Sequence, residues 1–480
     1  MKYHLVTLGC AKNISDSAGM QSLLSGAGYG EATAPNEADL LIVNTCGFLQ
    51  AARDESIDVL GQLGVEKRRE QILVAAGCLP QRIGDEIVAE VPWLDGVIGT
   101  QQWPRIVELV ETIQSRRLED RWRPFVMPPD DRNHVADSVG RRSTSHSAYL
   151  KIADGCSAPC AFCTIPSFKG KQRSKRPGDV LREAQQLVDL GAEEIVLVAQ
   201  DLTAYGHDWG EPIGMGLPAL LEMLCTEIEH EPGRLWYRLM YAYPGHANER
   251  LVEVMARHDG LIVPYLDMPL QHGDRRVLKR MRRPHKMERQ AAFFRSMREA
   301  LPHATLRTTF IVGFPGETEE EFQGLLDFMS EMQFDKVGVF PYSPEPGTPA
   351  GIMEGQLPEE VKQARWERAM AHQQPIALAR QERMVGQRLE VLVDGYDPEQ
   401  AVSLCRSYRE APEVDGYIVV PGSYDAGSRL KVRVTAAYPY DLEARVLARF
   451  EPVARQEPPP VIAIADAPPA AISIADIPVQ

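Results

Sequence analysis

Three cysteines stand within eight residues of this 480-residue chain, at Cys156, Cys160 and Cys163, in the spacing C-x3-C-x2-C. Thiolates are the ligands that iron–sulfur clusters require, and this spacing allows three of them to bind one compact centre. Structural zinc, the alternative, normally has four protein ligands, but no Cys or His occurs in the forty residues after Cys163. The triplet therefore predicts a 4Fe-4S cluster in which one iron has no ligand from the protein.

Three further cysteines, Cys10, Cys46 and Cys78, are spread through the first hundred residues, each directly after a short apolar run. Taken singly, each could be an ordinary packed thiol of an α/β core. The carboxyl ends of parallel strands meet at one edge of a sheet, so we expect the three thiols to converge there as ligands of a second three-cysteine cluster. Cys225 and Cys405 stand apart from other cysteines and are predicted to be packed thiols.

The elements that carry the dispersed cysteines form an alternating series. The apolar runs YHLVTLG, DLLIVNT and QILVAAG alternate with amphipathic stretches such as DSAGMQSLLSGAG. Short apolar runs between helices are typical of parallel strands, so residues 1–114 are predicted to form a Rossmann-like α/β domain. Residues 115–147 are rich in charged and turn residues with little periodicity, which indicates a linker.

A second α/β series follows and carries the cysteine triplet at its beginning. Six strand candidates are separated by helical patterns: AYLKIA, EIVLVAQ, WYRLMYAY, VPYLDMP, LRTTFIVGF and KVGVFPYS. The clearest helix begins at Pro177 and stops at Gly191. Six βα units predict a partial (β/α)6 barrel over residues 148–375.

The last part of the chain has a different pattern. Short strands joined by Gly and Asp turns, RLEVLVDG, DGYIVVPG and SRLKVRVTAAY, predict a small all-β barrel over residues 381–447. The segment 451–480 contains seven prolines and an approximate repeat, which predicts a disordered tail.

Charge and hydropathy exclude several classes of protein. The 52 Lys and Arg against 67 Asp and Glu give a net charge of −15, which excludes the uniformly basic surface of a general nucleic-acid binder. No apolar run approaches the roughly 18 residues of a membrane span, and the start MKYHLVTLGCAKN turns polar too soon for a secretory signal. We expect a cytoplasmic protein whose cysteines bind metal or act in catalysis.

The cysteine triplet on the loop after the first barrel strand resembles the radical S-adenosylmethionine (SAM) superfamily. Phe162 precedes the third cysteine, where that family has an aromatic residue beside the adenine. The resemblance implies that the amino and carboxylate groups of SAM bind the open iron, and that SAM is cleaved to methionine and a 5'-deoxyadenosyl radical. Such a radical is needed where the target is an unactivated C–H bond, so that the cofactor must supply the reactivity.

A closer resemblance covers about residues 2–446. Three dispersed cysteines, a radical SAM barrel and a carboxyl-terminal TRAM barrel together resemble the methylthiotransferases. The resemblance implies two 4Fe-4S clusters and two SAM molecules per turnover. It implies that the dispersed-cysteine cluster carries a sulfur that one SAM methylates, while the second SAM yields the radical that activates the target carbon. A sulfur donor and a reducing electron donor are implied as partners.

Among the branches of the family, the chain resembles the RimO type, which modifies the β-carbon of an aspartate of ribosomal protein S-twelve. The strings that carry this resemblance are LGCAKNISDS, YLKIADGC, IPSFKGKQRS, YLDMPLQHG, YPGH from Tyr243 to His246, and YSPEPGTPA. One departure is Ala18, where the family usually has DSE after the first cysteine. The alternatives are a MiaB-type enzyme, which modifies adenosine in tRNA, and a non-catalytic iron–sulfur or zinc module.

Charge in the last domain bears on the choice between a protein and a tRNA substrate. Residues 381–446 hold eight Lys and Arg against eleven Asp and Glu. A barrel that grips tRNA should be net positive, whereas an acidic barrel suits a basic ribosomal protein and argues against direct binding of nucleic acid. The alternative is that these acidic residues are simply solvated.

Other candidate residues follow the barrel strands. Gly313, Gly316 and Glu317 follow the fifth strand, where they could meet SAM, or they form a turn before a helix capped by Thr318. Gln271 and His272 end the fourth strand and are expected to face the barrel mouth, in contact with substrate or cofactor, although a lone His is often structural. A basic cluster could steer an anionic ligand or be a solvated face: Lys169, Lys171, Arg173, Lys175 and Arg176.

Overall fold

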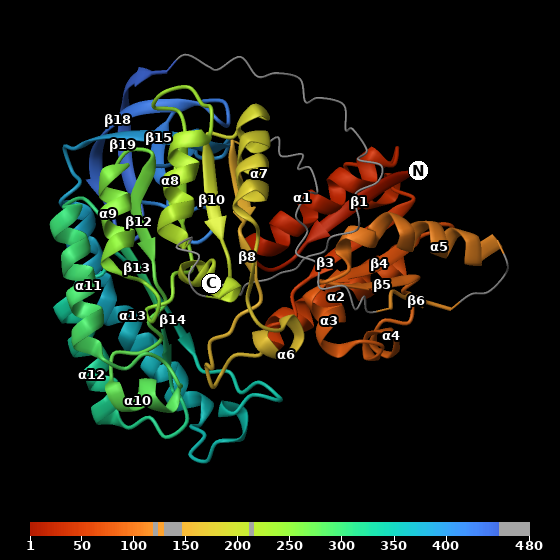
Figure 1. Cartoon of the computed structure of the whole chain (residues 1–480), viewed down its shortest axis with the longest axis horizontal. Helices are drawn as coiled ribbons and strands as arrows, with labels where there is room; N and C mark the ends of the chain where they lie inside the picture. Colours follow the sequence, from red (N-terminus) through yellow and green to blue (C-terminus); the bar gives the residue numbers. More distant parts are fainter. Residues whose placement is uncertain (119–122, 129–145, 211–215, 451–480) are drawn as a thin grey trace.

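The computed structural model describes residues 1–118, 123–128, 146–210 and 216–450. Three units follow one another along the chain: an amino-terminal α/β domain, a larger α/β barrel, and a small β-barrel. Figure 1 shows the first domain, in red and orange, beside the barrel, whose helices line its outer side, while the blue β-barrel covers one end. The predicted fold class is confirmed, and the tail predicted over 451–480 lies outside the described residues.

The first domain is a six-stranded parallel sheet in the order β2-β1-β3-β4-β5-β6. Every residue of β3 and β4 is buried, because helices cover both faces and the two apolar runs fill two separate cores. The strands are β1 (Lys2–Thr7), β2 (Gly30–Glu31), β3 (Leu40–Thr45), β4 (Ile72–Gly77), β5 (Gly96–Gly99) and β6 (Phe125–Val126), and the helices are α1 (Ala11–Gly26), α2 (Gln50–Glu66), α3 (Cys78–Ile83), α4 (Glu86–Glu90) and α5 (Ile106–Leu118).

Part of the segment interpreted as a linker belongs to this domain. Helix α5 continues to Leu118, and Phe125 and Val126 pair in parallel with Gly96 and Val97 of β5. Within the predicted linker 115–147, residues 119–122 and 129–145 lie outside the described part of the chain.

The second domain contains the six strands that the sequence predicts, all parallel and in sequential order around a partial barrel. They are β7 (Ser147–Lys151), β10 (Glu194–Val198), β11 (Trp236–Leu239), β12 (Ile262–Asp267), β13 (Thr305–Val312) and β14 (Lys336–Pro341). The longer helices lie outside the strands: α7 (Pro177–Asp189), α8 (Leu217–Glu227), α9 (Glu249–Arg257), α10 (Arg275–Arg280), α11 (Met287–Ala300), α12 (Glu319–Met332) and α13 (Glu359–Glu382). As predicted, α7 begins at Pro177, which fits the first helical turn because it needs no N–H donor.

The third domain is a closed barrel in the order β15-β16-β17-β19-β18. Its strands are β15 (Arg388–Asp397), β16 (Val402–Arg406), β17 (Ile418–Pro421), β18 (Arg429–Ala437) and β19 (Leu442–Arg449). The sequence predicts β15, β17 and β18, but not β16 or β19. Closure removes the free strand edges of this small sheet.

The loop between β16 and β17 closes the base of the larger barrel, at the amino ends of its strands. Glu194, at the start of β10, binds Arg238 of β11 and Arg406 of β16 at 2.7 Å each. Burial alone raises the pKa of Glu194, but the guanidinium groups of Arg406 and Arg238 outweigh it and lower the pKa to about 2. Nearby, Tyr265 donates a hydrogen bond to Asp415 at 2.7 Å. The third domain is therefore fixed to the barrel by buried charges.

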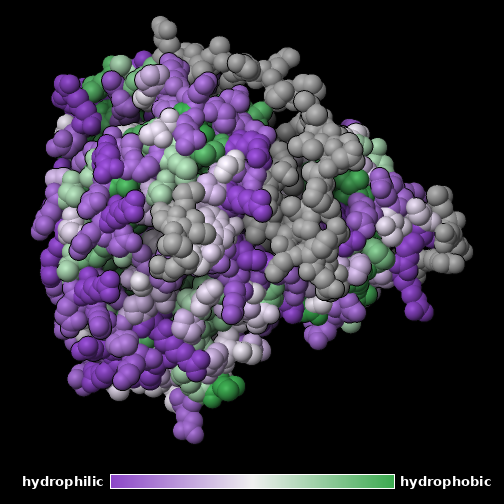
Figure 2. Space-filling model, viewed as in Figure 1, coloured by the Kyte–Doolittle hydropathy of each residue, from purple (hydrophilic) through white to green (hydrophobic). Residues whose placement is uncertain are grey.

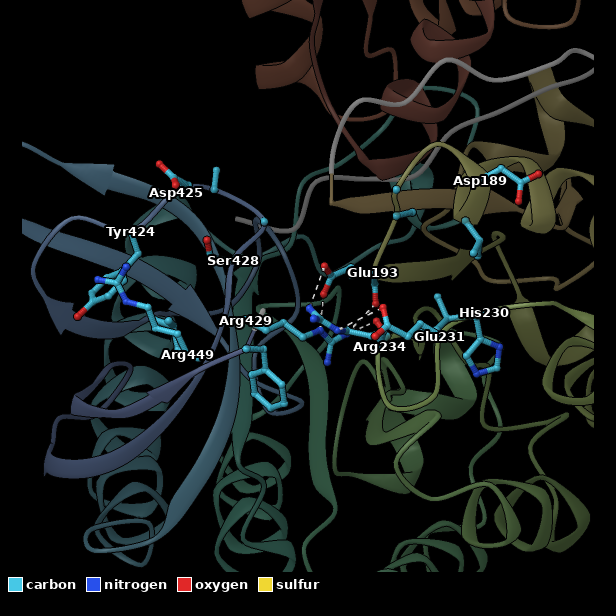
Figure 3. A pocket seen from close by; sticks show the side chains of 18 of the residues that line it. Asp189, Glu193, His230, Glu231, Arg234, Tyr424, Asp425, Ser428, Arg429 and Arg449 are labelled. Carbon is cyan, nitrogen blue, oxygen red and sulfur yellow. Dashed lines mark hydrogen bonds and ion pairs between the residues drawn. The ribbon is translucent and has the colours of Figure 1, made fainter. Parts of the chain in front are cut away.

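A cavity of about 560 Å³ lies between the two barrels at this same end (Figure 3). Its lining carries both signs of charge, including Asp189, Glu193, Arg234 and Arg429. The Arg429 guanidinium is paired with Glu193 and lies 4.2 Å from the ring centroid of Trp236. This cavity is at the opposite end of the strands from the cysteine triplet.

The face of the molecule in Figure 2 is mainly hydrophilic, with hydrophobic residues scattered singly or in small groups. None of the helices in the described part of the chain is long and apolar enough to cross a membrane.

Candidate functional site

The loops of Cys10, Cys46 and Cys78 interlock at the carboxyl edge of the first sheet. Gly9 has a φ of +89°, and a Cβ added there would lie 2.8 Å from Cys46 Cβ and 3.2 Å from Cys46 Sγ. A Cβ on Gly47 would lie 2.8 Å from the carbonyl group of Cys78. Only glycine permits these approaches. The structure thus brings together the three dispersed cysteines.

Asn13, in the first turn of α1, connects these loops. Its Oδ1 lies 4.0 Å from Cys10 Sγ and 3.6 Å from Cys78 Sγ. Its Nδ2 donates to the carbonyl oxygens of Leu8 at 2.7 Å and Thr45 at 3.1 Å, which fixes the amide orientation. The sequence analysis missed Asn13, although its place three residues after Cys10, at the start of a helix, was a usable signal.

Burial raises the pKa of all three thiols. The pKa of Cys78 rises to about 11, against a lowering effect of the Lys169 ammonium. For Cys46, burial and then the charges of Cys78 and Cys10 raise the pKa. Three ionised thiolates in this buried site therefore require a cation among them, and iron is a metal that thiolates bind.

The second set lies on the loop between β7 and the short helix α6 (Ile165–Lys169). The N–H of Cys156 donates to the Gly170 carbonyl at 3.1 Å, and the Arg283 guanidinium lies 3.5 Å from Cys160 Sγ. A two-stranded pair, β8 (Ala153–Asp154) and β9 (Arg173–Ser174), holds the two sides of the loop together. Burial raises the pKa of Cys156 to about 12, so here too ionised thiolates require a cation.

The two cysteine sets face each other across the domain boundary. One apolar cluster contains Cys46, Phe48 and Cys78 of the first domain with Ile165 and Phe168 of the second. Cys156 and Cys163 pack against the same cluster. Apolar side chains of both domains therefore pack together beside the two sets.

The donor chemistry of each set, three thiols, suits an iron–sulfur cluster. In the described part of the chain, no three Cys, His, Asp or Glu side chains converge closely enough to hold one metal ion. In a 4Fe-4S cluster each thiolate binds a different iron, so the sulfur atoms stand farther apart than around one zinc. The donor sets fit two three-cysteine clusters.

The carboxyl ends of β12 and β13 carry polar atoms that suit a bound ligand such as SAM. Gln271 has a φ of +79°, which is rare for a residue other than glycine. Its Oε1 and the Oγ1 of Thr309 are buried without a hydrogen-bond partner among the described residues. Backbone strain and unsatisfied polar atoms cluster at ligand sites, because the ligand supplies the missing contact.

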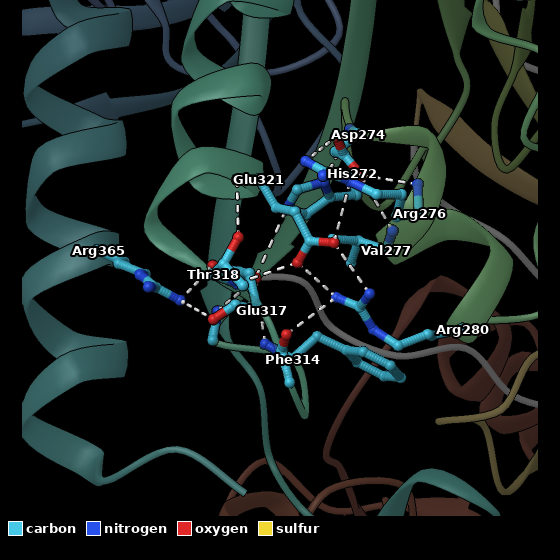
Figure 4. Close-up of polar contacts among 12 residues, drawn as sticks. His272, Asp274, Arg276, Val277, Arg280, Phe314, Glu317, Thr318, Glu321 and Arg365 are labelled. Carbon is cyan, nitrogen blue, oxygen red and sulfur yellow. Dashed lines mark hydrogen bonds and ion pairs between the residues drawn. The ribbon is translucent and has the colours of Figure 1, made fainter. Parts of the chain in front are cut away.

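Two of the lesser candidates, His272 and Glu317, lie buried beside each other (Figure 4). His272 is fully buried; its Nδ1 accepts a hydrogen bond from the Asp274 N–H at 2.9 Å, and its Nε2 lies 3.5 Å from Glu317. Glu317 accepts the N–H of Gly313 at 2.9 Å and a hydrogen bond from Arg365 at 2.9 Å. The Nε2 of His272 is buried without a hydrogen-bond partner among the described residues, as is the Oε1 of Gln271, so its contact with substrate or cofactor stays a prediction. Glu317 braces the loop after β13.

The loop after β13 forms the predicted turn before a capped helix. Thr318 caps α12 together with Glu321, as the alternative predicts. Gly313 has a φ of +74°, and a Cβ there would lie 2.5 Å from Lys362 Cγ, so close packing requires glycine. Phe162 is partly buried against an apolar cluster that includes Met281 and Phe314.

The basic cluster that follows the triplet is not one charged face. Lys169 and Lys175 are buried, and Lys175 is paired with Glu183. Lys171 and Arg176 are exposed. Sequence alone does not distinguish the buried lysines from the exposed basic residues, because the groups that bury or pair them belong to other elements. The two lone cysteines, Cys225 and Cys405, pack against apolar cores as predicted.

The sequence analysis also missed two cations near the cysteines. Arg283, described above, contacts Cys160 from 123 residues away in the chain. The Lys12 ammonium is buried 3.3 Å from the ring centroid of Tyr241, a residue of the second domain with a φ of +66°. Neither has a local sequence signal, since both contacts cross between elements.

Comparisons with known proteins agree with this architecture. Three family models match in succession: the uncharacterized protein family UPF0004 at residues 2–99, the radical SAM superfamily at 150–329, and the TRAM domain at 385–447. The fold and the facing cysteine sets therefore define a radical SAM protein with an additional cysteine-bearing domain and a TRAM barrel.

Relatives give the family within this class. The chain is 44% identical over 476 residues to ribosomal protein uS12 methylthiotransferase RimO of Roseiflexus sp. (strain RS-1), covering 95% of this chain and 99% of that one. It is 46% identical over 462 residues to the protein of the same name from Chloroflexus aurantiacus, covering 93% and 100%. The chain belongs to the RimO family of methylthiotransferases.

A solved structure shows the same fold at low sequence identity. It is the radical S-adenosylmethionine methyltransferase TsrM from Kitasatospora setae, with cobalamin and a 4Fe-4S cluster bound. The TM-score is 0.54 at 14% identity, and the match covers 73% of this chain and 77% of that chain.

Proposed function

We propose that this chain transfers a methylthio group to the β-carbon of an aspartate residue of ribosomal protein uS12. The observation that carries the proposal is the apolar cluster that both cysteine sets share across the domain boundary. A reaction that joins a sulfur carried at one centre to a carbon activated at the other needs the two centres side by side. The RimO relatives support the assignment of the substrate.

Each set has a distinct role in the proposal. Cys156, Cys160 and Cys163 hold the cluster that binds SAM, and Cys10, Cys46 and Cys78 hold the cluster that carries sulfur. When bound, the clusters and SAM supply a methylated sulfur and a hydrogen-abstracting radical. A sulfur donor and a reducing electron donor complete the proposed reaction.

The protein's own residues orient and shield these groups. Asn13 fixes the loops of Cys10 and Cys46 relative to each other through its hydrogen bonds to Leu8 and Thr45. Arg283 places a positive charge beside Cys160. Phe48 and Phe168 keep water from the space between the sets, which protects a reactive radical from side reactions. Gln271 and Thr309 offer the polar atoms that a bound SAM can satisfy.

The domain boundaries belong to the proposal as well. We assign sulfur transfer to the first domain, which extends beyond the predicted 1–114 to include α5 and β6, SAM cleavage to 148–375, and substrate contact to 381–447. Three of the basic residues of the last domain, Arg406, Arg409 and Arg429, are buried and paired with acidic residues of the barrel. They are not available to bind phosphate, which favours uS12 over tRNA as the substrate.

The experiment incubates the anaerobically reconstituted full chain with SAM, a reductant, and either uS12 or tRNA. The expected result is a mass increase of one methylthio group in place of hydrogen, on one aspartate of uS12. The matched variant Cys46→Ala should still cleave SAM to 5'-deoxyadenosine, because the second set is intact, but should yield no methylthiolated product.

Two outcomes would contradict the proposal. Modification of tRNA nucleosides with none on uS12 would indicate a MiaB-type enzyme. Failure to cleave SAM despite full iron loading would indicate a binding module.

A further inference from the structure

A buried carboxylate joins the two domains beside the facing cysteine sets. Glu345 lies on the loop after β14, and its side chain is only 1% exposed. Its Oε2 accepts hydrogen bonds from Arg53 at 2.7 Å and Arg82 at 2.9 Å, both from the first domain. Its Oε1 accepts the backbone N–H of Gln50 at 3.0 Å, at the start of α2.

Arg82 carries this contact to the loop of Cys46. Its second nitrogen, Nη1, donates to the carbonyl oxygens of Gly47 at 2.7 Å and Phe48 at 2.6 Å. These are the two residues directly after Cys46. One guanidinium group therefore binds Glu345 on one side and the ligand loop on the other.

The loop of Glu345 is tied in turn to the second cysteine set. The Thr348 hydroxyl donates to the Glu345 carbonyl at 2.7 Å, which makes the loop compact. Two residues later, the Ala350 N–H donates to the carbonyl of Ala161 at 2.8 Å. Ala161 lies between Cys160 and Cys163. An uninterrupted series of hydrogen bonds and short chain segments thus connects the Cys46 loop with the triplet loop.

We propose that Glu345 is a positioning residue, which fixes the orientation of the Cys46 loop relative to the Cys160–Cys163 loop. The proposal rests on the function proposed above. Because sulfur delivery depends on how the two centres face each other, a small change in this orientation slows transfer. SAM cleavage depends on the second set alone and does not need the contact.

The charges make Glu345→Gln an informative variant. The amide has nearly the shape of the carboxylate but no negative charge, so the buried Arg53 and the half-buried Arg82 lose their counter-charge. Glu345→Asp keeps the charge on a shorter side chain and should recover part of the function. A matched control is Glu108→Gln, which removes the charge from the exposed Arg105–Glu108 pair of the first domain, the domain that also contains Arg53 and Arg82.

The first readout is the ratio of 5'-deoxyadenosine formed to methylthiolated uS12. In Glu345→Gln we expect transfer to fall by about 100-fold, the effect of a displacement of about 1 Å. SAM cleavage should stay within about twofold of wild type and iron at about eight per chain. Glu108→Gln should match wild type in both products.

A second readout does not depend on turnover or on the identity of the substrate. With both clusters reduced, the magnetic interaction between them in electron paramagnetic resonance spectra reports their separation and orientation. We expect Glu345→Gln to change this interaction and Glu345→Asp to restore it in part. If wild type shows the interaction but modifies no uS12, the function fails while this test of Glu345 still stands.

Three results would overturn the proposal. One is an unchanged product ratio and unchanged magnetic interaction in Glu345→Gln. Another is a loss of iron and of both activities together, which would make Glu345 only a stabilising residue. If Glu345→Gln does not fold, Arg82→Lys is used instead, since lysine keeps the charge but cannot reach Glu345, Gly47 and Phe48 at once. A wild-type product ratio in that variant is the third refuting result.

Discussion

The contact between Gly9 and Cys46 predicts the effect of Gly9→Ala. The added Cβ would lie 2.8 Å from Cys46 Cβ, whereas the shortest ordinary contact is 3.4 Å. Restoring an ordinary contact therefore requires Cys46 to shift by about 0.6 Å, which exceeds the roughly 0.2 Å range of metal–ligand distances. The positive φ of Gly9 costs roughly 1–2 kcal/mol for alanine, and the forced contact about 1–3 kcal/mol more.

The matched control is Gly28→Ala. Gly28 has a φ of +84° in the same domain, but an added Cβ has nothing within 4 Å. It carries the backbone strain without the contact. Both substitutions are made in the Cys156→Ala/Cys160→Ala/Cys163→Ala background, so that iron reports the first set alone.

The assay is iron and sulfide per chain after anaerobic reconstitution. Gly28→Ala should retain about four irons, and Gly9→Ala should hold about one or fewer because Cys46 no longer reaches its ligand position. Equal iron contents in the two variants would refute the argument that Gly9 is required by the close approach of Cys46.

Four other predictions test three separate parts of the structure. Glu194→Gln should destabilise the packing of the third domain by about 3–5 kcal/mol, seen as faster hydrogen exchange there, because the buried Arg238 loses its carboxylate partner and Arg406 keeps only Asp394. With a folded pKa of about 2, the stabilisation by Glu194 is present above 4.5 and should be lost as pH falls toward 2, which protease resistance of the third domain can follow. The hydrogen bond to Asp201 raises the pKa of His246. The protonated His246–Asp201 pair therefore stabilises the folded protein fully below pH 6.5, and this stabilisation is lost as pH rises through the raised pKa. In His246→Gln, the pH dependence of the thermal unfolding temperature should lack this component. Arg283→Gln removes a positive charge 3.5 Å from Cys160 Sγ and should lower the reduction potential of the second cluster by tens of mV to roughly 100 mV in a redox titration; an unchanged potential would contradict the contact.

The strands of the two parallel sheets were largely predictable, whereas the short strands were not. Runs such as LLIVNT and EIVLV are buried along their whole length, so continuous apolar sequence identifies them. Strand β2 has only two residues, and β5 is GVIG, too short to show a period. Strand β19 alternates apolar and polar residues only from Leu442 to Val446, which is too short a run to identify it, and its pairing with β17 and β18 depends on contacts between elements.

The residues that could bind iron were identifiable from their type and spacing, but their surroundings were not. Glu345 and Gln50 are 295 residues apart in the sequence, so no local pattern predicts this contact between the domains. The position of His272 at the end of a strand was recognisable, but its contacts with the Asp274 N–H and Glu317 were not. Lys175 was interpreted as part of a basic cluster that could be a solvated face, but it is buried and paired with Glu183.

The central claim is that the chain holds two separate clusters, each on three thiolates. The most direct measurement is the iron content of three proteins after anaerobic reconstitution: wild type, Cys10→Ala/Cys46→Ala/Cys78→Ala, and Cys156→Ala/Cys160→Ala/Cys163→Ala. We predict about eight irons in wild type and about four in each variant, with SAM cleavage lost only in the last. If the last variant retains no iron, the first three cysteines are packed thiols and the two-cluster account is wrong.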